Sequence, residues 1–167
     1  MGTEYYVPVS VSRRIEAPAV EIFNILTDPT KHPDIDGSGM LRESASLLRV
    51  SGVGDVFVMK MHNEEFGDYE MNNLVVAYEE NRRIGWAPTL LREQEASTDL
   101  PVEKSAAITW TFQLTPDGPH ATEVTEIYDC SNASEELRRA VKNGDRWLES
   151  MTKTLQRLDE YCAGATS

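Results

Sequence analysis

The sequence predicts an α+β fold in which a curved antiparallel sheet of about seven strands wraps around a long C-terminal helix. The main observation is the segment 134–162, where apolar residues recur in steps of three and four, as on one side of an amphipathic helix. These residues are Leu148, Met151, Leu155, Leu158 and Cys162. The second observation is that nearly everything before this segment reads as strands joined by short turns, which favours antiparallel pairing. Because a single sheet must bury one face, we expect the helix to cover it.

The elements follow in order from the local patterns. The first strand is expected at 7–15, and the helical spacing of Ala19, Ile22 and Leu26 predicts a short helix that ends near Pro29. A second helical turn and a loop are expected within 30–39. Six further strands are expected at 40–50, 56–62, 68–78, 82–87, 107–114 and 121–129. A polar, acidic loop without periodicity is expected at 88–105.

The composition limits the function classes. A chain of 167 residues with 40% hydrophobic and 26% charged residues fits one soluble globular domain, 1–167. The net charge of -12 argues against nucleic acid and anionic membranes as partners. No apolar run reaches membrane-spanning length, and no secretion signal is evident, so we expect a cytoplasmic protein. Cys130 and Cys162 lack CxxC spacing; free thiols are expected, although a disulfide remains possible.

Neither a metal nor a cofactor is expected from the motifs. The three histidines, His32, His62 and His120, form no metal-binding motif, and no GxSxG nucleophile motif is present. The glycines at 52 and 54 do not lead into a helix, so they make no phosphate-binding or dinucleotide loop.

One acidic residue is a candidate for a pocket. If Val124 faces inward, the two-residue period of a strand also turns Thr122, Glu126 and Tyr128 inward. Burial would raise the pKa of Glu126, which could then act as a general base or as a polar anchor for a ligand. The alternative is a charge at the rim, paired with an arginine of the final helix such as Arg138, Arg139 or Arg146.

Several short motifs along the chain resemble a known superfamily. They are IEAP at 15–18, VEIF at 20–23, TDP at 27–29, HPDIDGSG at 32–39, VGDVF at 53–57, NRRIGW at 81–86 and TEVTE at 122–126. Together they resemble the helix-grip proteins of the SRPBCC superfamily (START-like, plant pathogenesis-related and polyketide cyclase/dehydrase-like), in particular an actinobacterial branch. The resemblance implies a cavity between the sheet and the final helix that holds an apolar or amphipathic small molecule.

The resemblance and the strand parity together predict which residues contact that molecule. They are His32, Phe57, Met59, Met71, Trp86, Trp110, Glu126, Tyr128, Trp147, Leu148 and Met151. For the aromatic and methionine side chains the alternative is plain core packing. A break at Asn143–Gly144 is expected to divide the final helix, either as a kink or as a hinge for ligand access, and the loop 88–105 would be a second lid. Leu155 and Leu158, further from the break, are expected to be core.

Three functions follow as hypotheses. The first is non-catalytic binding of an apolar or aromatic small molecule by a monomer or homodimer. The second is a polyketide aromatase/cyclase or dehydratase-like enzyme, in which Tyr128, Glu126 or His32 would move protons. The third is a regulatory or protein-interaction module.

Overall fold

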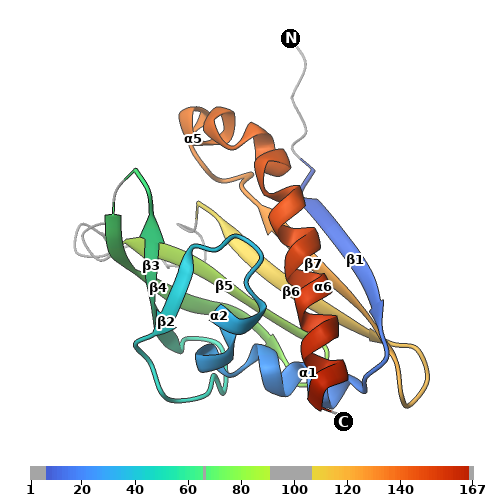
Figure 1. The fold of residues 1–167 in the computed structure, drawn as a ribbon. Helices are drawn as coiled ribbons and strands as arrows, with labels where there is room; N and C mark the ends of the chain where they lie inside the picture. The colour runs from blue at the N-terminus through green and yellow to red at the C-terminus, as the bar shows by residue number, and fades with distance from the viewer. Residues whose placement is uncertain (1–6, 66, 91–106, 166–167) are drawn as a thin grey trace.

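The described residues form one seven-stranded antiparallel sheet in a computed structural model that covers 7–65, 67–90 and 107–165 (Figure 1). The strands lie in the order β1-β7-β6-β5-β4-β3-β2. Their bounds are β1 Val9–Ile15, β2 Leu41–Ser44, β3 Val56–Asn63, β4 Gly67–Glu79, β5 Arg83–Leu90, β6 Thr109–Pro116 and β7 Thr122–Asp129. Short turns join β3 to β4, β4 to β5 and β6 to β7, and β1 pairs with β7 from the far end of the chain.

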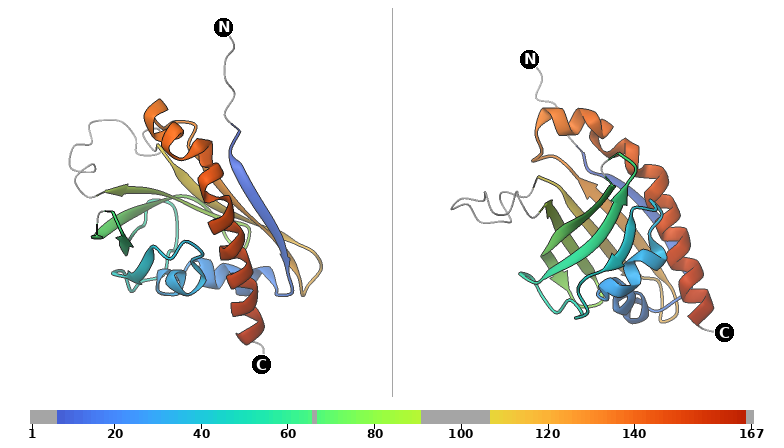
Figure 2. Two further views of the ribbon diagram at one scale, coloured as in Figure 1. Left: turned by 45° about the horizontal axis from the view of Figure 1, so that its top comes forward. Right: turned by 60° about the vertical axis from the view of Figure 1, so that its left-hand side comes forward.

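The helices lie on one side of this sheet. They are α1 Ala19–Leu26, η1 Pro29–Lys31, α2 His32–Ile35, α5 Glu135–Ala140, η2 Lys142–Trp147 and α6 Leu148–Ala165. Figure 2 shows α6 running along the inner side of the curved sheet, with α1 and α2 beside it. The predicted fold class is therefore confirmed: a helix-grip arrangement with short helices after the first strand. None of the described helices is long and apolar enough to cross a membrane.

The core fills the end of the molecule where α1 and the second half of α6 meet the sheet. Leu155, Leu158 and Cys162 on α6 are each 1% exposed or less and belong to one cluster with Ile15 and Val124 of the sheet. Burying a side chain of this size contributes roughly 1.5–3 kcal/mol. The expectation that Leu155 and Leu158 are core residues is confirmed.

The final helical segment is broken where the sequence predicted it. Asn143 and Gly144 have positive φ values of 55° and 100°, which separate α5 from α6. A Cβ atom at Gly144 would lie 2.7 Å from a methyl carbon of Val9 and 2.9 Å from the ring of Tyr128. The glycine therefore serves two purposes: it adopts the left-handed backbone and allows the chain to approach β1 and β7 closely.

Two predicted boundaries were wrong. The strand expected at 40–50 ends at Ser44, and Leu47 and Leu48 in the following loop are more than 80% exposed. Two adjacent leucines have no alternation, so they gave no true strand signal. The loop expected from Pro88 begins later, because β5 continues to Leu90 and pairs with β4. Proline is tolerated there because the pairing with β6 ends at Trp86. Of the second lid expected at 88–105, residues 91–105 lie outside the described residues.

Candidate functional site

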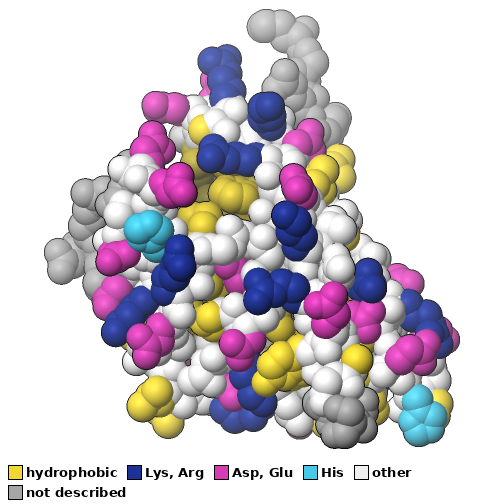
Figure 3. All heavy atoms as spheres, viewed as in Figure 1, with side chains coloured by type: hydrophobic (Ala, Val, Ile, Leu, Met, Phe, Trp, Pro, Cys, Tyr) yellow, Lys and Arg dark blue, Asp and Glu magenta, His cyan; other side chains and the backbone are white. Residues whose placement is uncertain are grey.

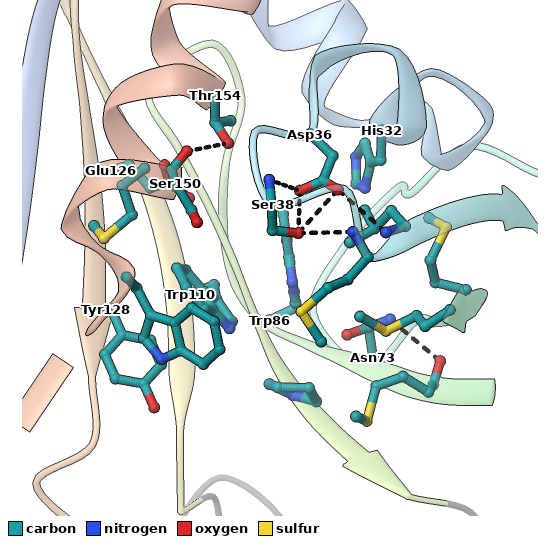
Figure 4. Close-up of a pocket in the computed structure, with 18 of the residues that line it drawn as sticks. His32, Asp36, Ser38, Asn73, Trp86, Trp110, Glu126, Tyr128, Ser150 and Thr154 are labelled. Atoms are coloured by element: carbon teal, nitrogen blue, oxygen red, sulfur yellow. Dashed lines mark hydrogen bonds between the residues drawn. The ribbon is translucent and has the colours of Figure 1, made fainter. Parts of the chain in front are cut away.

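A cavity of about 260 Å³ lies between the inner face of the sheet, α2 and the first half of α6 (Figure 4). Ten of the residues predicted to contact a ligand line it: His32, Phe57, Met59, Met71, Trp86, Trp110, Glu126, Tyr128, Trp147 and Met151. Figure 3, which has the same view as Figure 1, shows a hollow in the upper part of the molecule. Hydrophobic side chains lie at its bottom and charged side chains surround it.

Leu148 is the exception among the predicted residues. It is 36% exposed and is not part of the cavity wall. The helix instead presents Trp147, Ser150, Met151 and Thr154 to the cavity, at the spacing i, i+3, i+4 and i+7. Leu148 lies at the edge of the apolar stripe, on the side turned away from this set. The prediction that it faces the cavity is therefore wrong.

Strand alternation places the larger side chains of the wall. On β7, Thr122, Val124, Glu126 and Tyr128 are all buried and Glu123 is exposed, as the two-residue period requires. On β3, Phe57 and Met59 are buried on the inner face, and Met61 follows them into the cavity wall. Trp86 on β5 and Trp110 on β6 lie opposite each other in the strand register.

Glu126 is a buried carboxyl group in the cavity wall. It is 6% exposed, and its Oε1 atom has no hydrogen-bond partner among the described residues. Burial, together with the negative charge of Asp36, raises the pKa of Glu126 to about 8. The group is therefore mostly protonated near neutral pH. The alternative position at the rim, paired with Arg138, Arg139 or Arg146, is wrong.

His32, at the start of α2, lies inside the cavity wall. It is 4% exposed, and its ring stacks on Trp86 with centroids 5.2 Å apart. Nε2 donates a hydrogen bond to the backbone oxygen of Leu26 at 2.8 Å, which requires a proton on Nε2. Burial lowers the pKa of His32 because the charged imidazolium would lose its hydration. The ring is thus a neutral, fixed part of the wall.

Asp36 and Ser38 form a polar corner that the sequence did not single out. The carboxylate of Asp36 accepts hydrogen bonds from the Ser38 amide and hydroxyl and from the Leu41 amide, at 2.8–3.1 Å. Figure 4 shows this corner on the opposite side of the cavity from Glu126 and Ser150. The sequence feature that could have indicated this corner is the Asp-x-Ser spacing. It is typical of an aspartate side chain that accepts a hydrogen bond from the backbone amide two residues later.

A threonine ties this corner to α6. Thr154 Oγ1 accepts a hydrogen bond from the Gly37 amide and donates one to the Ser150 carbonyl oxygen, both at 2.9 Å. Gly37 lies so close to the α6 backbone that no side chain would fit there. The wall between α2 and α6 is therefore held in a fixed position by a polar contact that needs glycine at 37.

An aromatic cluster forms the end of the cavity near the helix break. The ring centroids of Trp110 and Tyr128 are 4.6 Å apart, and Trp147 lies 6.3–6.4 Å from both. Burial raises the pKa of the Tyr128 hydroxyl, so the phenol is neutral. The buried indole N–H of Trp147 interacts with the Tyr128 side chain, although not with full hydrogen-bond geometry.

Other sequence candidates lie away from the cavity. His62 on β3 faces outward and its Nδ1 lies 2.7 Å from a carboxylate oxygen of Asp68. Cys130 and Cys162 are free and buried, so the disulfide left open by the sequence does not form. No group of three or more histidine, cysteine or acidic side chains in the described part of the chain could hold a metal ion.

Comparisons with known proteins add relatives and fold neighbours. No family model matches the chain. Uncharacterized protein Rv0088 of Mycobacterium tuberculosis strain H37Rv is 31% identical over 145 residues, which are 85% of this chain and 54% of that protein. Uncharacterized protein MT0096 of strain CDC 1551 is 32% identical over the same shares. The chain therefore spans about half the length of the curated relatives it matches.

Solved structures share the fold. Protein Ms6760 from Mycobacterium smegmatis has a TM-score of 0.67 at 15% identity, over 97% of this chain and 94% of that one. A protein from Rhodobacter sphaeroides has a TM-score of 0.66 at 18% identity, over 98% and 96%. At these identities the likeness shows the fold alone.

Proposed function

We propose that the chain binds an apolar or aromatic small molecule in the cavity between the sheet and α6, without catalysing a reaction. We further propose that it is a member of the SRPBCC superfamily, in the branch with mycobacterial relatives. The observation that carries the proposal is the cavity itself, about 260 Å³ of space walled by aromatic and thioether side chains.

The make-up of the wall supports a ligand of this kind. Well-packed protein interiors leave few voids larger than a water molecule, so space on this scale in a small domain calls for an occupant. Ligand pockets are mostly apolar with a few placed polar groups, and here Glu126 presents an unpartnered oxygen atom. Methionines at 59, 71 and 151 can adapt their side chains to an apolar surface.

A substitution that fills the cavity tests the proposal. Ser150 lies on α6 in the wall and is only partly buried, so Ser150→Phe would project a ring into the space. The probe is naphthalenemethanol, and its binding is measured by isothermal titration calorimetry. We expect it to bind the wild type and Ser150→Ala with similar affinity. Ser150→Phe should weaken binding by at least about tenfold. Equal binding by the Phe variant, or no binding by the wild type, would contradict the proposal.

A second candidate function is proton-transfer catalysis of the polyketide cyclase or dehydratase kind. One observation favours it: Glu126, which retains a proton near neutral pH, shares the cavity with Tyr128 and His32. If the chain is such an enzyme, Glu126→Gln and Tyr128→Phe should each lower the turnover of a poly-ketone substrate by about a hundredfold. Unchanged turnover in both variants would exclude these two residues as the acid or base.

A further inference from the structure

The formal charges of the cavity wall are all negative. Among its described residues are two acidic side chains, Asp36 and Glu126, and neither a lysine nor an arginine. The other titratable groups are His32, which is neutral, and the phenols of Tyr69 and Tyr128. An anionic ligand head would therefore lose its hydration beside Asp36 and gain no cation to compensate.

Cations near the wall lie behind it rather than in it. Arg157 donates a hydrogen bond to the backbone oxygen of Asp36 without being part of the cavity lining. The exposed guanidinium of Arg146 lies over the ring of Trp147, 5.5 Å from its centroid. This contact also shows that the face of a wall aromatic can attract a positive charge.

The unpartnered oxygen of Glu126 indicates what the ligand should offer. A buried polar atom without a hydrogen bond is unfavourable, and a ligand that donates to Glu126 Oε1 removes that cost. An ammonium group does more, because it donates hydrogen bonds and also compensates the negative charge of Asp36. Hydrogen bonds between charged partners are about twice as strong as those between neutral ones.

We propose that the cavity is specific for an apolar or aromatic amine, with its ammonium group directed at Glu126 and Asp36 and its apolar body among Trp86, Trp110 and Trp147. This rests on the proposed binding function and names the ligand class. A carboxylate or phosphate of the same shape is excluded by the acidic wall, and a neutral alcohol binds more weakly than the amine.

Binding of a cation also has a consequence for protons. Glu126 is mostly protonated in the free protein, and an ammonium group beside it favours the ionised form. Binding of the amine should therefore release a proton to the buffer. Asp36 faces Glu126 and already raises its pKa, while His32 and the two phenols are neutral and remain so. An alcohol leaves Glu126 protonated and releases none.

Three probes with one ring system test the ligand class: naphthylmethylamine, naphthalenemethanol and naphthoic acid, titrated calorimetrically at about pH 7.5. The amine should bind about tenfold more tightly than the alcohol, and the acid most weakly. Titrations in phosphate and Tris, which differ in ionisation enthalpy, should show proton release for the amine alone. If the alcohol or the acid binds as tightly as the amine, the inference is overturned while the proposed function stands. If none of the three binds, the proposed function itself fails.

Matched variants locate the selectivity. Glu126→Gln keeps the size of the side chain and removes its ionisation, so the preference for amine over alcohol should fall to less than about threefold and proton release should cease. Glu123→Gln makes the same chemical change on the exposed side of β7 and should retain the wild-type preference. An undiminished preference in the Glu126 variant would contradict the assignment.

Discussion

Replacing Glu126 with glutamine should change how the stability of the protein depends on pH. In the folded protein the pKa of this group is about 8, whereas its ordinary value is 4.5. Between these two values the unfolded chain has released a proton that the folded protein keeps. Stability therefore falls as the pH rises through this window, and the loss stops above the folded pKa. Glutamine has no such proton, so Glu126→Gln should lose less stability as the pH rises.

The size of the effect follows from the two pKa values. One proton difference changes the free energy of unfolding by about 1.4 kcal/mol per pH unit. Integrated from about pH 5 to pH 7.5, the variant should gain about 3 kcal/mol on the wild type. The gain needs no new contact, because it removes the cost of keeping a carboxyl group away from water.

Urea denaturation of the wild type, Glu126→Gln and Glu123→Gln at the two pH values measures this difference. The exposed Glu123 variant should follow the wild type within about 0.5 kcal/mol at both. His32 also makes stability depend on pH. Because burial lowers its pKa, the unfolded chain binds a proton below pH 6.5 that the folded protein does not, so stability falls there, equally in all three proteins. If the gap between wild type and Glu126→Gln is the same at both pH values, Glu126 does not carry a raised pKa.

Two further substitutions, one of them with a matched control, test local features of the fold by urea denaturation. Gly144→Ala should lower the free energy of unfolding by about 2–4 kcal/mol, because its Cβ atom would lie 2.7 Å from Val9. The control Gly118→Ala, at φ 80° and with open space around it, should lower it by only about 1 kcal/mol, and equal losses in the two variants would refute the packing role of Gly144. Thr122→Val should cost about 1–2 kcal/mol, since its hydroxyl donates a 2.8 Å hydrogen bond to the buried oxygen of Ala17, and a neutral effect would show that this bond is unimportant.

Much of the fold was predictable because two periodicities are strong in this chain. Alternation identified the inner face of β3 and β7, and so placed Glu126 and Tyr128 in the interior once Val124 was assumed to face inward. The steps of three and four identified the buried stripe of α6. These patterns are local consequences of backbone geometry, so they can be read without knowing the tertiary contacts.

The polar part of the cavity was harder to predict, because polar residues carry no burial signal of their own. Thr154 and Ser150 face inward only because α6 docks against α2 through Gly37, a contact between segments more than a hundred residues apart. Asn73, which also lines the cavity, was predictable because it lies two residues after Met71 on one strand and so shares its face. Whether Glu126 had a partner depended on the tertiary position of the helix arginines, which no local pattern contains.

A crystal structure of the protein with bound naphthylmethylamine would show directly whether the cavity holds an amine beside Glu126. We expect the ring system between α6 and the sheet, in contact with Trp86 and Trp110, and the amine nitrogen within hydrogen-bond distance of Glu126. A structure in which the probe lies elsewhere, or in which the wall side chains close together and leave no space beside Met151, would contradict this expectation.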